Sequence, residues 1–181
     1  MDTFLMLLLI ALPIVWFVYE DKKQHKQYPI ICKEKGNKGE AIVAEKLSLL
    51  SCDYIVKNNI IMNGITQIDH LVICAESRDI FVIETKYWAG IISGETSDKK
   101  WMQDNNGMIK YYGNPILQNK YHCKIVRRNY RDYNIHNIVV FVNNKNVPES
   151  RIIKTQNELV NYIYKTTSKV YNRATIDMQT D

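Results

Sequence analysis

The sequence predicts an α/β fold, with a mixed sheet flanked by helices and preceded by an N-terminal transmembrane helix. Two neighbouring runs rich in Ile, Val and Phe, Thr66 to Cys74 and Asp79 to Lys86, have the composition of β-strands. Segments with apolar residues at intervals of three and four lie before and after them, which indicates flanking helices. With 181 residues, the chain has room for one ordinary domain and an appendage.

The unbroken apolar run Phe4 to Tyr19 predicts a membrane anchor over residues 1–20. A spanning helix needs about 17–25 such residues, and Trp16 and Tyr19 would lie at one membrane interface. Lysines cluster directly after the run, in a basic juxtamembrane linker over residues 21–34. The positive-inside rule therefore places the rest of the chain in the cytoplasm. A cleaved signal peptide and a buried helix are the alternatives.

The spacing from Gly39 to Leu50 predicts the first helix of the domain, with Val43 and Leu47 on its apolar face. Glu40 falls in the first turn of this helix, on the side that is otherwise apolar. Such a carboxylate can complement the partial positive charge at a helix start, which contributes about 0.3–1 kcal/mol, or it can point toward a functional site. Spacing alone does not choose between these two roles.

An antiparallel meander of three strands is expected next. Tyr54 to Ile61 has the composition of a strand, and Asn63-Gly64 is a strong hairpin signal. This hairpin leads directly into the strand that ends at Cys74, and a polar turn joins that strand to the next one.

The rest of the chain predicts short strands and two further helices. Ile91 and Ile92 indicate a short strand, and a second hairpin should flank an Asn-Asn-Gly turn. Trp101, in that hairpin, is expected in the core. The other predicted elements are a helix from Asn114-Pro115 to about Tyr133, a buried strand from Ile138 to Val142, a closing helix from Gln156 to Lys169, and a flexible tail over residues 171–181.

Side-chain alternation along the two central strands brings acidic groups together. If the turn between these strands is symmetric, Asp69 lies directly opposite Glu84, and Gln67 lies opposite Lys86. Like charges on facing positions destabilise a sheet. A shared proton, a neighbouring cation or a divalent metal would relieve the repulsion, and Lys86 supplies one positive charge for two negative ones. We therefore predict a Mg²⁺ (or Mn²⁺) site of the kind found in phosphate-ester enzymes.

Asp69, followed by Glu84-Thr85-Lys86 at the end of a hydrophobic strand, resembles the PD-(D/E)xK pattern of restriction-type nucleases. Further motifs between Lys35 and Val142 together resemble the nuclease-related domain, NERD. These motifs are GNKGE at Gly36 to Glu40, QIDH at Gln67 to His70, IETK ending at Lys86, Trp101, and Asn114-Pro115 followed by Gln118. One departure is Ile68, which stands where the superfamily pattern has a proline. The resemblance implies a restriction-endonuclease-like fold in a nuclease domain over residues 35–170.

The resemblance also implies how a nuclease site would be built. Asp69, Glu84 and the backbone carbonyl of Thr85 would hold the metal ion. Glu40 would contact the ion directly or through water. Lys86 would orient the attacking water or help to deprotonate it. The reaction implied is hydrolysis of a phosphodiester by in-line displacement.

Gln67 would hold the attacking water or a phosphate oxygen in the same implied site. The net charge of +5 favours an anionic partner. Lys120, Lys124, Arg127 and Arg131 form a stripe on one predicted helix, which suits contacts with the phosphates of a nucleic acid. A stripe of this kind is otherwise only a solvated helix face. With the resemblance, the expected partner is nucleic acid, DNA in preference to RNA.

Two other interpretations remain open. The same fold can serve as a membrane-tethered module that binds nucleic acid or a protein partner without cleaving it. Alternatively, Asp69, Glu84 and Lys86 form only a network of ion pairs between strands, and the basic helix stripe serves solubility. Cleavage that depends on a divalent metal would separate the nuclease from both alternatives.

Overall fold

The computed structural model describes residues 20, 23 and 33–177. Apart from residue 20, the predicted membrane anchor over residues 1–20 lies outside this part of the chain. Among the residues described, no helix is long and apolar enough to cross a membrane. The chain divides into two units, Met1–Asn37 and Lys38–Asp181. The residues of the candidate site belong to the second unit.

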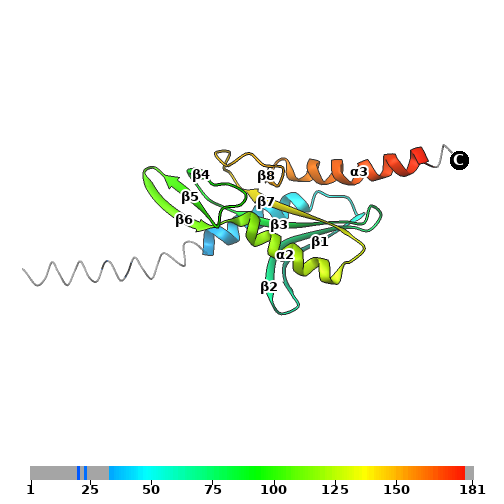
Figure 1. Cartoon of the computed structure of the whole chain (residues 1–181), viewed down its shortest axis with the longest axis horizontal. Helices are drawn as coiled ribbons and strands as arrows, with labels where there is room; N and C mark the ends of the chain where they lie inside the picture. The colour runs from blue at the N-terminus through cyan, green and yellow to red at the C-terminus, as the bar shows by residue number, and fades with distance from the viewer. Residues whose placement is uncertain (1–19, 21–22, 24–32, 178–181) are drawn as a thin grey trace, which may run out of the picture. The chain divides into compact units, whose positions relative to one another are not determined.

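The larger of two sheets in the described part of the chain has five strands (Figure 1). Strands β1, β2 and β3 form the predicted antiparallel meander, and β7 and β8 add to it in parallel. The prediction of a mixed sheet is therefore confirmed. In spatial order the strands are β1 (Tyr54–Met62), β2 (Thr66–Cys74), β3 (Asp79–Lys86), β7 (Asn134–Phe141) and β8 (Ile153–Thr155).

The smaller sheet contains β4 (Ile91–Ser93), β5 (Lys100–Asn105) and β6 (Met108–Gly113). Its β5–β6 hairpin turns at Asn106 and Gly107, both with positive φ, as the Asn-Asn-Gly sequence predicts. Trp101 of β5 is fully buried, and its Nε1 donates to the Glu95 carbonyl at 2.9 Å. The prediction that this tryptophan belongs to the core is confirmed.

Helices cover both faces of the larger sheet. On one face, helix 33–47 and α3 (Leu159–Asp177) pack against Val72, Phe81 and Val140 through a shared apolar cluster. On the other face, α2 (Pro115–Asn129) packs against Leu71, Ile80 and other apolar residues of β2 and β3. Neighbouring residues of β2 and β3 contribute to opposite clusters because strand side chains alternate. This alternation also decides which strand residues point toward α2.

Several predicted boundaries are wrong. Residues 33–47 are helical, so the first helix does not begin at Gly39, and Glu40 is not in its first turn. The helix-start explanation for this carboxylate therefore no longer applies. Helix α2 stops at Asn129 and not near Tyr133, because the chain must turn before β7 begins at Asn134.

The carboxyl-terminal helix begins later than predicted and also ends later. Residues 156–158 form a turn, in which the Glu158 carboxylate accepts from the Thr155 N–H at 2.8 Å. Helix α3 follows this turn and continues to Asp177, past the predicted end at Lys169. Residues 178–181 lie outside the described part of the chain, so flexibility over residues 171–181 stays a prediction.

The buried side of α2 is more polar than the sequence predicts. The spacing predicts an apolar side that includes Leu117, Tyr121, Ile125 and Val126. Ile125 and Val126 are buried, but Leu117 and Tyr121 are 36% and 52% exposed. Asn119 and His122 are buried in their place. The Asn119 Nδ2 donates to the carbonyls of Val82 at 2.7 Å and Ile138 at 3.0 Å. These bonds attach α2 to β3 and β7, which fixes the face that α2 turns toward the sheet.

Candidate active site

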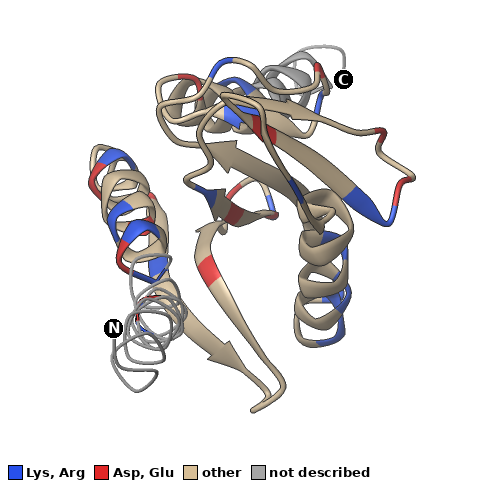
Figure 2. Ribbon diagram, turned by 90° about the vertical axis from the view of Figure 1, so that its left-hand side faces the viewer, with Lys and Arg blue, Asp and Glu red and all other residues tan. Residues whose placement is uncertain are grey.

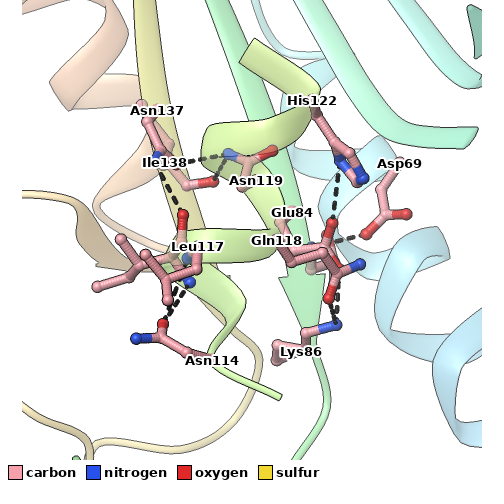
Figure 3. A network of polar contacts seen from close by, with 12 residues as sticks. Asp69, Glu84, Lys86, Asn114, Leu117, Gln118, Asn119, His122, Asn137 and Ile138 are labelled. Atoms are coloured by element: carbon pink, nitrogen blue, oxygen red, sulfur yellow. Dashed lines mark hydrogen bonds and ion pairs between the residues drawn. The ribbon is translucent and has the colours of Figure 1, made fainter. Parts of the chain in front are cut away.

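Strands β2 and β3 pair in the register that the sequence predicts. Their pairing continues from the symmetric turn to His70, which faces Ile83. Asp69 and Glu84 are the next residues along the two strands, so they lie side by side at this end of the pair. The N–H of Thr85 donates to Asp69 Oδ2 at 2.8 Å (Figure 3). The prediction that the two carboxylates converge on one end of the sheet therefore agrees with the structure.

Asn59 lies where the pairing of β1 with β2 skips Asp69. Its φ of 52° is in the left-handed region, which Asn tolerates better than most residues. Its Oδ1 accepts from Gln67 Nε2 at 3.0 Å, and its side chain also hydrogen-bonds to Glu40. Asn59 therefore links two predicted site residues, although no sequence motif indicated it. Its place in the middle of a predicted strand was the available signal, because Asn is depleted in strands.

Glu40 reaches the site because helix 33–47 lies very close to the end of β3. A Cβ atom at Gly39 would stand 3.0 Å from Tyr87 Cβ and 3.4 Å from Thr85 Cγ2, so a side chain here would push the helix away. Burial raises the pKa of Glu40, and the negative charge of Asp69 raises it further. The helix thus contributes a third carboxylate to the acidic cluster of β2 and β3.

Lys86 is the cation at the end of β3. Its Nζ lies 2.6 Å from Glu84 Oε1 and 3.1 Å from Gln118 Oε1, and Figure 3 shows both contacts. Gln67 was expected opposite Lys86, but the hydrogen bond of its amide goes to Asn59. The glutamine that contacts Lys86 is therefore Gln118 of α2. Helix α2 and helix 33–47 pack against opposite faces of the sheet.

His122 points from α2 toward Glu84 (Figure 3). Its Nδ1 lies 3.5 Å from Glu84 Oε2, and both atoms are buried without a hydrogen-bond partner. Burial lowers the pKa of His122, against the opposing effect of the Asp69 carboxylate. Gln118 and His122 are four residues apart, so they lie one turn apart on the same helix face. That spacing was visible in the sequence, but it did not show that the face turns toward the carboxylates.

The cluster contains more acidic than basic groups. Glu84 is only 2% exposed, and burial raises its pKa to about 7, with smaller contributions from the charges of Asp69 and Glu40. Lys86 opposes this rise without cancelling it. Burial also raises the pKa of Asp69, although the N–H of Thr85 favours its charged form. Three carboxylates are therefore held together around one ammonium group.

The donor atoms of this cluster fit Mg²⁺ or Mn²⁺. Glu84 Oε2 is a buried carboxylate oxygen without a hydrogen-bond partner, which a bound cation would satisfy. In the described residues, no group of three or more His, Cys, Asp and Glu side chains is positioned to hold a metal ion. Magnesium in phosphate-ester enzymes is commonly bound by one or two carboxylates, with waters and substrate phosphate as the other ligands. The residues present therefore fit the ion that the sequence predicts.

Basic side chains line the outer surface of α2. Lys120, Lys124 and Arg127 are exposed on this helix, as predicted. Arg131 is exposed too, but it lies beyond the helix end and so does not continue the stripe in helical geometry. Helix α2 contains no Asp or Glu, and Figure 2 shows it coloured for Lys and Arg alone. The structure thus places a helix whose only charged residues are Lys and Arg next to the acidic cluster.

Fold and site together define an α/β protein of the nuclease-related class. Its central strand ends in the sequence Glu84-Thr85-Lys86, beside Asp69 of the preceding strand. The family model described as the nuclease-related domain, NERD, matches residues 35–142, which is more than half of the chain. The chain belongs to this family.

A curated relative is an uncharacterized protein of Bacillus anthracis, 35% identical over 99 residues. The similar region covers 52% of this chain and 46% of the relative, so the chain matches less than half of that protein's length. No solved structure matches.

Proposed function

We propose that this protein is a nuclease that depends on a divalent metal and hydrolyses phosphodiester bonds of nucleic acid, DNA in preference to RNA. Residues 1–20 would anchor it in the membrane as a single span, with the nuclease domain in the cytoplasm. The observation that carries the proposal is the convergence of Glu40, Asp69 and Glu84 on Lys86 at the end of β3. A cross-strand ion-pair network alone would not gather three carboxylates around one cation, because like charges repel.

Asp69 and Glu84 would hold Mg²⁺ or Mn²⁺ together with the backbone carbonyl of Thr85. Glu40 would complete the set directly or through a water molecule. A metal ion in such a site polarises the phosphoryl oxygen and lowers the pKa of a bound water. The hydrogen bond from the Thr85 N–H keeps one oxygen of Asp69 turned toward the end of β3. Its other oxygen is the one available to a ligand.

Lys86 is placed to act on the nucleophile. Its Nζ is held between Glu84 Oε1 and Gln118 Oε1, so the ammonium group stays at the end of β3. From this position it would orient the attacking water or assist the loss of its proton. The water oxygen forms the new bond to phosphorus, the ester bond on the opposite side breaks, and the departing alkoxide takes up a proton.

Gln67 would contact a phosphate oxygen or the attacking water at the outer edge of the site. Its side chain is exposed and is held by the hydrogen bond to Asn59 Oδ1. The basic residues of α2 would contact phosphates on either side of the scissile one. Contacts of this kind position a strand and carry no sequence information.

A cleavage assay tests the proposal. The full-length chain in a non-ionic detergent is incubated with single-stranded and duplex DNA and RNA, in Mg²⁺, Mn²⁺ or EDTA. We expect cleavage only with a metal, and a loss of at least about 100-fold in Glu84→Ala and Lys86→Ala, because each removes a group acting on the reacting atoms. The matched controls are Glu45→Ala and Lys165→Ala, whose side chains are exposed on the helices that flank the sheet.

The variants also separate the nuclease from the binding module. Loss of metal binding in Asp69→Ala with unchanged DNA binding supports the nuclease. If the wild-type chain and all variants are equally inert with every nucleic acid and metal, the protein is a binding module built on a nuclease fold.

A further inference from the structure

We propose that the exposed face of α2 binds a single-stranded segment of nucleic acid and guides it to the candidate site. This inference rests on the proposed function and specifies the substrate class. The surface consists of Leu117, Tyr121, Lys124 and Arg128, which we call the α2 strip. Its residues follow at intervals of four, three and four, so they share one helix face.

The α2 strip adjoins the residues that face the acidic cluster. Tyr121 lies three residues after Gln118 and directly before His122 in the sequence, and these two residues contact Lys86 and Glu84. The ring of Tyr121 meets the His122 ring edge-on, with 6.3 Å between centroids. A base stacked on Tyr121 would therefore lie within about one helical turn of the residues that contact the acidic cluster.

Leu117 and Tyr121 on this face are exposed, and neither belongs to the apolar clusters described between α2 and the strands. Tyr121 is 52% exposed and Leu117 is 36% exposed, whereas Asn119 and Val126 form the side that contacts the sheet. An exposed aromatic ring offers a stacking surface, and a base stacked on such a ring contributes about 1–3 kcal/mol. Stacking does not depend on which base is present, because each base has a π-face.

The charge of the strip selects a nucleic acid over an uncharged partner. Lys124 and Arg128 lie three and seven residues after Tyr121, so their cationic groups follow the ring by about one and two turns on the same helix face. No acidic residue on α2 opposes them. A stacking ring next to cations is the combination that binds single strands, in which bases and phosphates are both accessible. In a duplex the bases are stacked on each other, and the ring would have no base face to contact.

Binding measured without metal tests the α2 strip separately from cleavage. Fluorescence anisotropy in EDTA compares the full-length chain in non-ionic detergent with a single-stranded oligonucleotide and with a duplex of the same length. We expect tighter binding of the single strand. Tyr121→Ala should weaken single-strand binding by about 5- to 100-fold, and Tyr121→Phe should restore it, because the ring carries the stacking. Duplex binding should change little in Tyr121→Ala.

Controls distinguish the strip from general basicity. Tyr111→Ala, at an exposed tyrosine of β6, should bind as the wild type does. The double variant Lys124→Ala/Arg128→Ala should weaken binding of both oligonucleotides. It should also reduce the slope of log K against log salt concentration by about one to two. Polyglutamate, an anion without bases, should compete poorly with the single strand. Equal binding of single strand and duplex, no effect of Tyr121→Ala, or effective competition by polyglutamate would each overturn the inference.

The two proposals can fail separately. Tight single-strand binding that depends on Tyr121, without cleavage in any metal, would refute the nuclease proposal and support the proposal for the α2 strip. Metal-dependent cleavage that is insensitive to Tyr121→Ala would support the nuclease proposal and refute the proposal for the α2 strip.

Discussion

Glu84→Gln should change how the stability of the metal-free protein depends on pH. Burial raises the pKa of the Glu84 carboxyl from 4.5 to about 7. Below about pH 4.5 this group is protonated in both the folded and unfolded states, and above about pH 7 it is ionised in both. Between these values the folded state keeps a proton that the unfolded state loses. The free energy of unfolding therefore falls as the pH rises from about 4.5 through about 7.

The magnitude follows from the size of the pKa shift. Each unit corresponds to about 1.4 kcal/mol, so the contribution of Glu84 between pH 5 and pH 8 is about 2–3 kcal/mol. Glutamine does not ionise, so Glu84→Gln should lose this part of the pH dependence. Mg²⁺ should stabilise the wild type most above pH 7, by about 2.7 kcal/mol when the free ion is at 100 times its dissociation constant. Mg²⁺ should stabilise Glu84→Gln much less, because this variant lacks the Glu84 carboxylate as a metal ligand.

Urea unfolding followed by tryptophan fluorescence measures both effects, since Trp101 is fully buried. The full-length chain is compared at pH 5 and pH 8, in EDTA and in Mg²⁺. Glu45→Gln, at an exposed position on helix 33–47, is the matched control. If the change in unfolding free energy between pH 5 and pH 8 is the same in Glu84→Gln as in the wild type, the reasoning from the buried carboxylate is wrong.

Three further predictions concern the parts that support the site. Gly39→Ala should cost about 1–3 kcal/mol and weaken metal binding measured by calorimetry, because a Cβ would stand 3.0 Å from Tyr87 Cβ; an unchanged affinity would contradict this. Asn119→Ala should cost about 2–4 kcal/mol in urea unfolding, because it removes the hydrogen bonds from α2 to the Val82 and Ile138 carbonyls; a cost below about 0.5 kcal/mol would show that α2 is held by other contacts. Deleting residues 1–20 should release the protein from salt-washed membranes, whereas full-length protein in the soluble fraction would exclude the anchor.

Local patterns were sufficient for the strands of the meander. The bounds Thr66–Cys74 and Asp79–Lys86 agree with β2 and β3, because both strands are dense in apolar residues and end at polar turns. The register between them also followed from the sequence, since a symmetric turn fixes all later pairs. That register places Asp69 beside Glu84, so the proximity of the two carboxylates could be predicted from local pattern and turn geometry.

The contributions of α2 to the site were harder to predict. Helical spacing predicts an apolar side that includes Ile125 and Val126, which are buried, but also Leu117 and Tyr121, which are exposed. In the structure, α2 packs across the middle of β3 and β7, where the Asn119 side chain donates to the carbonyls of Val82 and Ile138. With Asn119 bound to these carbonyls, the helix turns Gln118 and His122 toward the acidic cluster. Hydrophobic periodicity carries no information about side-chain hydrogen bonds, so it was right for Ile125 and Val126 and wrong for Leu117 and Tyr121.

The sequence by itself determined the order of β1, β2 and β3, the register of β2 with β3, and therefore the pair Asp69 and Glu84 with Lys86 after them. These features depend on side-chain alternation and turn geometry, which are properties of neighbouring residues. Only the tertiary structure decided which residues surround that pair. The approach of helix 33–47 at Gly39 brings Glu40, and the hydrogen bonds of Asn119 bring Gln118 and His122, because each depends on packing between segments distant in the chain.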